Sequence, residues 1–148
     1  MTQHDPPFGG TKLALICDES VVTYLRDDIA NIPHPNTWDF AGGERQGDEG
    51  PIECGLRELF EEFGLRVDPA RVESLTGFRQ RDGRSLPVYF GVVHISADEI
   101  ESIRFGNEGQ YWTLMSLHDF IHHPRAIPHL QRCISDYVRT SGPFNPQA

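Results

Sequence analysis

Residues Gly43 to Leu65, GERQGDEGPIECGLRELFEEFGL, are the stretch on which the fold of this chain depends. Pro51 stands where a helix would begin, since its missing N–H would lack a helical partner there in any case. Apolar side chains then recur at helical spacing, and Gly64 follows them as a typical helix stop. We therefore predict a helix over residues 51–63 whose apolar positions are Ile52, Leu56, Leu59, Phe60 and Phe63.

Three glutamates of this helix share one face. Glu58, Glu61 and Glu62 stand at positions i, i+3 and i+4. Like charges at this spacing destabilise an isolated helix by about 0.2–0.5 kcal/mol per pair. A hard cation such as Mg²⁺, which prefers oxygen ligands, would offset that repulsion, whereas a solvated acidic face is the alternative. Gly43 can bring its backbone carbonyl close to such a cation, because no side chain blocks the approach.

The whole stretch resembles the Nudix box, G-x5-E-x7-R-E-U-x-E-E-x-G-U with U aliphatic, and every specified position matches. The resemblance implies an α/β Nudix fold, an α/β/α sandwich with a mixed β-sheet, in which the box forms a loop–helix–loop. It also implies metal binding by the three glutamates, with help from the Gly43 carbonyl. The residue matching the box arginine, Arg57, is expected to pair with Glu49 and to brace the site.

A further carboxylate usually comes from a later loop in this family. Four acidic residues qualify, and we select Glu108, because the segment from Asn107 to Leu117 resembles the one that carries the extra glutamate in MutT-type enzymes. Glu108 is the first choice for the general base and for a further metal ligand, with Glu61 second as base. The predicted catalytic set is thus Glu61, Glu108 and the supporting Arg57. The other three acidic residues are expected on a solvent face: Asp98, Glu99 and Glu101.

Candidates for substrate contact lie outside the box. Phe40 could stack on a base, as the matching aromatic does in MutT-type enzymes, or pack in the core. Arg26 ends an expected strand and could meet phosphate or base, or remain a surface arginine. Arginines around an expected turn could touch phosphates or simply be solvated: Arg79, Arg81 and Arg84. His118 and His122 have a spacing found in zinc sites, but no third ligand is evident, and a helix end explains them better.

Length and composition favour a single domain without a membrane span. The chain has 148 residues and a formal net charge of −9, opposite to that of most nucleic-acid binders, so nucleic acid is an improbable partner. No apolar run approaches the ~20 residues that cross a bilayer. The three cysteines are dispersed, which favours reduced thiols and a cytoplasmic protein. We expect a flexible tail over 1–10, the Nudix domain over 11–140 and a second tail over 141–148.

The remaining elements should alternate irregularly and form a mixed sheet covered by helices. Turn residues and β-rich runs predict strands over 12–17, 21–25, 38–40, 71–79, 86–95 and 111–114. Helices are expected over 117–122 and 127–140.

Together these features predict Mg²⁺-dependent cleavage of a phosphoanhydride bond in a nucleoside diphosphate linked to another moiety, with Mn²⁺ as a possible substitute. The sequence features after the box that are typical of ADP-ribose, dinucleoside polyphosphate and NADH hydrolases are missing. Their absence favours a MutT-type (deoxy)nucleoside triphosphate pyrophosphohydrolase. The alternatives are a nucleotide-sugar or ADP-ribose hydrolase, an RNA 5′-pyrophosphohydrolase, and a non-catalytic nucleotide sensor. A homodimer is compatible with the sequence, which carries no signal for any oligomeric state.

Overall fold

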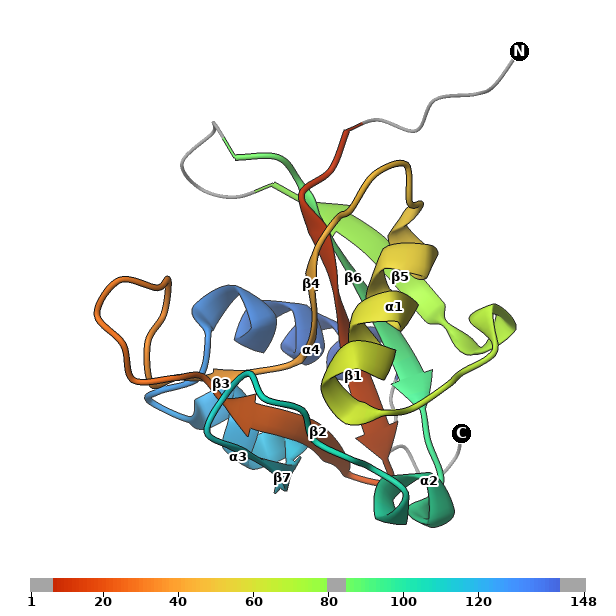
Figure 1. The fold of residues 1–148 in the computed structure, drawn as a ribbon. Coiled ribbons are helices and arrows are strands. Elements are labelled where there is room, and N and C mark those ends of the chain that lie inside the picture. Colours follow the sequence, from red (N-terminus) through yellow and green to blue (C-terminus); the bar gives the residue numbers. More distant parts are fainter. Residues whose placement is uncertain (1–6, 80–84, 142–148) are drawn as a thin grey trace.

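A mixed β-sheet forms the centre of the protein in the computed structural model, which describes residues 7–79 and 85–141 (Figure 1). The seven strands are β1 Gly10–Cys17, β2 Ser20–Leu25, β3 Trp38–Asp39, β4 Ala41–Glu44, β5 Glu73–Phe78, β6 Val88–His94 and β7 Tyr111–Ser116. The helices are α1 Pro51–Phe63, α2 Ala97–Glu101, α3 Leu117–His122 and α4 Pro128–Ser141, and a short 3₁₀ turn spans Pro69–Arg71.

The sheet has the strand order β3-β2-β1-β6-β5, with β4 also paired to β1 and β7 to β2. Among the strand pairs of the described residues, β1 and β6 alone run parallel, from Gly10 opposite Val88 to Ile16 opposite His94. The predicted hairpin of β1 and β2 is present, with Ile16 opposite Val21. These pairings confirm the mixed sheet and place β1 between β2 and β6.

Helices cover both faces of the sheet, which confirms the α/β/α sandwich (Figure 1). Successive side chains of a strand point to opposite faces, so β1 supplies Leu13 and Leu15 to one core and Ala14 and Ile16 to the other. The first core lies under α1 and the second under α3 and α4. Burial on both faces explains why β1 reads as a continuous apolar run.

Helix α1 has the predicted bounds, Pro51–Phe63. The Glu53 side chain accepts a hydrogen bond from the Gly50 N–H at 2.8 Å, and Gly64 ends the helix in the left-handed conformation. Gly55, unfavourable for helix formation in itself, lets α1 approach β1: a Cβ there would lie 2.9 Å from Cγ2 of Thr11. Phe60 was predicted on the apolar face of this helix, but its side chain is exposed. The Arg66 guanidinium lies over one face of its ring.

Several expected boundaries are wrong. Phe8 is buried and Gly10 already begins β1, so these residues do not belong to the flexible tail expected over 1–10, and residues 1–6 lie outside the described part. At the other end Ser141 completes α4, and residues 142–148 lie outside the described part. Strand β5 starts two residues late because the Asp68 carboxylate accepts a hydrogen bond from the Ala70 N–H and stabilises a turn instead. Across residues 7–79 and 85–141, no helix is long and apolar enough to cross a bilayer.

Candidate active site

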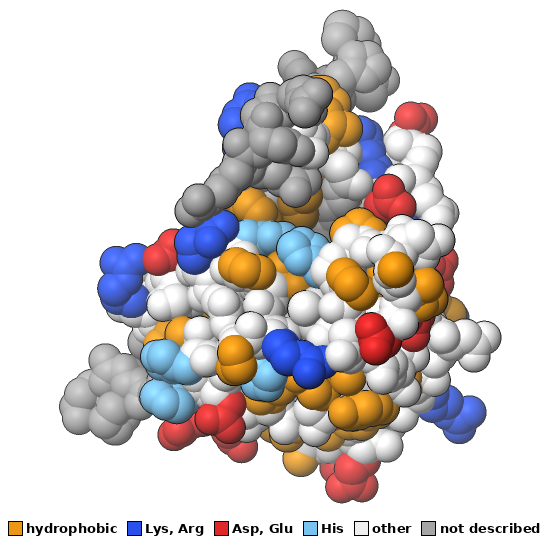
Figure 2. Space-filling view, turned by 90° about the vertical axis from the view of Figure 1, so that its left-hand side faces the viewer, with side chains coloured by type: hydrophobic (Ala, Val, Ile, Leu, Met, Phe, Trp, Pro, Cys, Tyr) orange, Lys and Arg blue, Asp and Glu red, His pale blue; other side chains and the backbone are white. Residues whose placement is uncertain are grey.

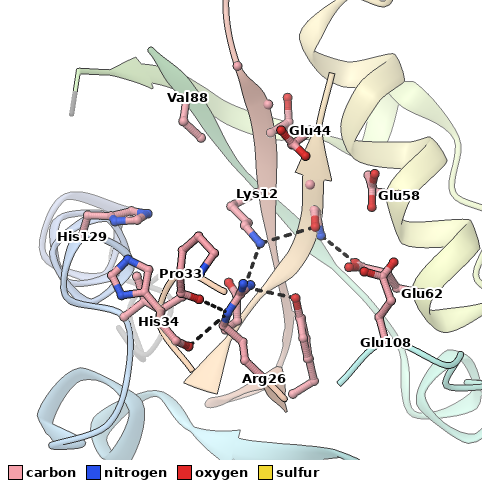
Figure 3. Close-up of a pocket in the computed structure, with 18 of the residues that line it drawn as sticks. Lys12, Arg26, Pro33, His34, Glu44, Glu58, Glu62, Val88, Glu108 and His129 are labelled. Atoms are coloured by element: carbon pink, nitrogen blue, oxygen red, sulfur yellow. Dashed lines mark hydrogen bonds and ion pairs between the residues drawn. The ribbon is translucent and has the colours of Figure 1, made fainter. Parts of the chain in front are cut away.

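A cavity of about 730 Å³ opens between α1 and the loop that joins β2 to β3. One wall carries Glu58, Glu62 and Glu108, and the opposite wall carries His34 and His129 (Figure 3). The wall of carboxylates combines the box helix with a loop some 50 residues further along the chain. Of the four predicted metal-binding glutamates, three therefore line one cavity.

Glu62 is the most buried of these carboxylates, at 8% exposure. Its Oε1 accepts a hydrogen bond from the Gly42 N–H at 2.8 Å, which fixes the side chain against β4 (Figure 3). Burial raises the pKa of Glu62 to about 8, because removal from water penalises the charged form. The nearby Lys12 ammonium opposes this shift, but only in part.

Glu58 lies directly against the glycine that precedes the box loop. A Cβ added to Gly43 would stand 2.6 Å from the Glu58 carboxylate, so a side chain at this position would displace that carboxylate. Burial raises the pKa of Glu58, and the negative charges of Glu61 and Glu108 act in the same direction. Glu58 and Glu108 line the same cavity, so the later loop faces the box helix.

Arg57 braces the box loop against α1. Its Nε donates to Glu49 Oε2, and its Nη2 donates to Glu49 Oε1 at 3.2 Å and to the Glu44 carbonyl at 2.8 Å. The second terminal nitrogen donates to Glu58 and Glu61 at 3.1 Å each. Because Arg57 lowers the pKa of Glu49, that carboxylate stays charged and the pair persists. Arg57 thus acts on the loop and on two of the glutamates.

Glu61 and Glu108 are the more accessible members of the predicted set. The Glu61 side chain is 54% exposed and is held by Arg57 outside the cavity lining. Among residues 7–79 and 85–141, no three His, Cys, Asp or Glu side chains are gathered tightly enough to hold a metal ion as they stand. Carboxylates together with the Gly43 carbonyl are nevertheless the oxygen donors that a hard dication prefers, so their chemistry fits Mg²⁺ or Mn²⁺.

A buried charge network forms the floor between the two walls, and sequence reasoning missed most of it. Asp39 is fully buried, and its Oδ2 accepts hydrogen bonds from Lys12 Nζ and Arg26 Nη1 at 2.9 Å and from the Tyr24 hydroxyl at 3.1 Å. Although burial favours the neutral acid, Lys12 and Arg26 hold the pKa of Asp39 below its usual range. Two cations around one anion leave the floor with a net positive charge.

Arg26 lies in the cavity as a candidate contact, but it also holds the β2–β3 loop. Its Nε donates to the carbonyls of Pro33 at 3.0 Å and His34 at 3.2 Å (Figure 3). The Gln110 side-chain amide donates to the Arg26 carbonyl at 2.8 Å and to Asn36 Oδ1 at 2.9 Å. Gln110 therefore joins the β2–β3 loop to the segment that carries Glu108.

The structure contradicts a substrate contact for Phe40. Its side chain is fully buried and stacks on Phe120 with ring centroids 4.4 Å apart, so no face is open to a base. The packing interpretation of Phe40 is correct, since the alternation of β3 and β4 turns this ring toward α3. Of the turn arginines, Arg79 is exposed and does not line the cavity, whereas Arg81 and Arg84 lie outside the described residues.

The histidine pair of α3 ends a helix. His118 and His122 are exposed with ring centroids 4.4 Å apart, and His122 Nδ1 lies 2.9 Å from the His118 carbonyl. No third acidic, thiol or imidazole ligand joins them within the described residues. The cysteines Cys17, Cys54 and Cys133 are all free thiols, as expected.

The family is decided by a match along most of the chain. The NUDIX domain family model matches residues 10–137, which contain the whole sheet and the carboxylate wall. The chain belongs to the Nudix family. This Nudix protein is accordingly a hydrolase of the pyrophosphohydrolase class. No curated protein matches it.

Solved structures share the fold of this Nudix hydrolase at low sequence identity. The MutT protein from Methanosarcina mazei Go1 is 17% identical, with a TM-score of 0.69 over 94% of this chain and 99% of that one. A bifunctional NMN adenylyltransferase/ADP ribose pyrophosphatase from Francisella tularensis is 18% identical, with a TM-score of 0.73 over 94% of this chain but 42% of that one. A C. elegans Ap4A hydrolase is 14% identical, with a TM-score of 0.65 over 88% and 98%. At these identities the likeness shows the fold alone.

Proposed function

We propose that this Nudix protein hydrolyses a phosphoanhydride bond in a nucleoside diphosphate linked to another moiety, using Mg²⁺ or Mn²⁺. The observation that carries the proposal is the convergence of Glu58 and Glu62 from the box helix with Glu108 from a distant loop on one cavity. Carboxylates placed together at partial burial repel one another, and burial already raises the pKa of both box residues. A dication and a phosphate chain relieve that repulsion.

The metal ligands are proposed to be Glu58, Glu61, Glu62 and Glu108, with the Gly43 carbonyl. When bound, the cation neutralises phosphate charge and polarises the attacked phosphorus. The ligands are held by the fold in different ways, since Glu62 is fixed by the β4 backbone and the other box glutamates by a single arginine. A Francisella tularensis enzyme of this fold was solved in complex with AMP and a Mn ion, which agrees with the choice of metals.

Glu108 is the proposed general base. Its carboxylate is exposed on the cavity and makes no hydrogen bond or ion pair within the described part of the chain, so it is free to accept a proton from the attacking water. Glu61 is the second candidate, but the Arg57 guanidinium already engages it at 3.1 Å. Arg57 is proposed to support catalysis by holding the box loop rather than by touching substrate.

The substrate is proposed to be a (deoxy)nucleoside triphosphate, cleaved to a monophosphate and pyrophosphate. A cavity of about 730 Å³ suits a mononucleotide, since pockets for small ligands span about 300–1,000 Å³. The net charge of −9 disfavours long nucleic acid. Free thiols fit a cytoplasmic enzyme. A homodimer is compatible with this proposal.

A substrate panel tests this function. Nucleoside triphosphates, ADP-ribose, a dinucleoside tetraphosphate and 5′-triphosphorylated RNA are incubated with Mg²⁺ or Mn²⁺. The products are separated by ion-exchange chromatography and quantified for the wild type, Glu62→Gln and Glu101→Gln. Glu101 is exposed on α2, outside the cavity, and makes a matched control. Metal-dependent turnover that Glu62→Gln lowers by two or more orders of magnitude supports the proposal. Nucleotide binding without turnover would instead identify a sensor, and preferred cleavage of another panel member would replace the triphosphate.

A further inference from the structure

The end of the cavity away from the glutamates has a different chemistry. It is lined by Pro33, His34, Ile127 and His129, which come from the β2–β3 loop and the start of α4 (Figure 3). Figure 2 views this side of the molecule, where histidine side chains lie next to hydrophobic ones. None of these four side chains is a carboxylate or a guanidinium. The neighbouring Arg26 guanidinium is engaged by Asp39 and by the carbonyls of Pro33 and His34. This end therefore suits an uncharged ligand part better than a phosphate.

The His129 ring forms one wall of this end of the cavity. Its ring lies 5.2 Å from the Phe78 ring and 6.3 Å from the His34 ring, between centroids. Burial lowers the pKa of His129 to about 4, which makes it a neutral imidazole near pH 7. A neutral imidazole offers one donor and one acceptor. Within the described residues, neither the His129 nor the His34 ring makes a hydrogen bond, so these nitrogens are open to a ligand.

The loop that carries His34 has two residues in the left-handed region of backbone conformation. His34 has a φ of 50° and Asn36 a φ of 56°, a region that is uncommon for non-glycine residues but that His and Asn enter more often than most. Three side chains fix the loop backbone: Arg26 on the His34 carbonyl, Thr37 on the same carbonyl at 2.6 Å, and Arg125 on the Asn36 carbonyl at 2.9 Å. An uncommon backbone conformation that several surrounding contacts hold in place is characteristic of ligand sites.

We propose that His34 and His129 form the subsite for the nucleobase and set the base preference of the enzyme. The inference rests on the proposed function, because the carboxylate wall fixes which end of the substrate carries the phosphates. Pro33 and Ile127 supply an apolar surface for the flat faces of a base, while the imidazole nitrogens meet polar atoms at its edge. The positive floor of Lys12 lies between the two ends, beside the path of the phosphate chain.

The test compares substrates that differ only in the base. Steady-state kinetics are measured with ATP, GTP, CTP, UTP and abasic ribose 5′-triphosphate, for the wild type, His129→Phe, His34→Ala and the control His118→Ala. Phenylalanine keeps the ring contact with Phe78 but removes both nitrogens. For the preferred nucleotide, the ratio of its kcat/KM to that of the abasic compound should fall about 5- to 20-fold in each cavity variant, mainly through KM. The exposed His118 should leave the ratio unchanged.

Two results overturn the inference. If His129→Phe lowers kcat/KM equally for all five substrates, the residue has a structural role only. If the wild-type kcat/KM is the same with and without a base, no base subsite exists. In both cases the proposed hydrolysis stands. If the wild type turns over none of them, the triphosphate is not its substrate, and the wider proposal of phosphoanhydride hydrolysis is decided by the other members of the substrate panel. The inference is then decided by NMR of ring-labelled histidine, since nucleotide but not tripolyphosphate should shift the His34 and His129 signals, and unchanged signals refute it.

Discussion

Glu62→Gln should make the metal-free protein more stable while it abolishes activity. The folded-state pKa of Glu62 is about 8, raised by burial from 4.5. A group whose pKa is raised on folding favours the folded state at low pH, and this contribution is lost as pH rises through the folded value. Between pH 4.5 and 8, the unfolded chain therefore releases a proton that the folded protein retains. Glutamine has no charge to bury, and its carbonyl oxygen can still accept the Gly42 N–H.

The size of the effect follows from the two pKa values. A difference of one pKa unit corresponds to about 1.4 kcal/mol. At pH 7 the unfolded chain gains about 3 kcal/mol by ionising Glu62, which the folded protein keeps protonated, so the metal-free wild type is less stable than the glutamine variant by that amount. At pH 4 both states are protonated and the difference disappears. For a domain of this size, about 3 kcal/mol corresponds to roughly 6–12 °C in Tm.

Thermal unfolding of the wild type and Glu62→Gln in EDTA, from pH 4 to pH 9, measures this difference. The variant should gain over the wild type steadily above pH 5, and added Mg²⁺ should stabilise only the wild type, because binding to the folded state is what raises its Tm. An equal or lower Tm for Glu62→Gln at pH 8 would refute the reasoning. So would a Tm difference that does not depend on pH.

Three further substitutions separate packing from chemistry. Phe40→Leu should lower stability by about 1–3 kcal/mol in urea titrations and leave KM for the nucleotide within twofold, whereas a large rise in KM would restore a substrate contact. Gly43→Ala should weaken Mg²⁺ binding, measured by calorimetry, at least tenfold, since its methyl group meets the Glu58 carboxylate at 2.6 Å; unchanged affinity would show that the loop can yield. Arg57→Lys loses the two-pronged contact with Glu49 and should lower kcat about 10- to 100-fold, and a rate close to wild type would contradict its bracing role.

Features that depend on neighbouring residues could be predicted from the sequence. The bounds of α1 and α3 follow from helical periodicity and end signals that lie within one or two turns. The same kind of signal was present for the missed helix α2, where Ser96 and Glu99 form a capping box, Ser-x-x-Glu. Helix α2 could not be recognised from hydrophobic periodicity, because five residues are too few to show a period.

Features that depend on contacts across the chain could not be predicted. His34 and His129 are 95 positions apart and meet only because the β2–β3 loop and α4 border the same cavity. Asp39 reads as a polar residue beside a tryptophan, and nothing local indicates that it is buried between two cations. Phe8 stands in a segment rich in proline and glycine, yet the Arg45 guanidinium and Tyr89 enclose its ring.

The bridging amide of Gln110 has a consequence for attempts to change what the enzyme accepts. Its side chain connects the loop that bears His34 to the strand end beside Glu108. A change in the conformation of that loop will therefore also displace Glu108, the proposed general base. Libraries that randomise the β2–β3 loop alone should therefore yield many slow enzymes among the altered ones. Libraries that vary Asn36 and Gln110 together with the loop should contain variants with a changed substrate preference that keep a high kcat.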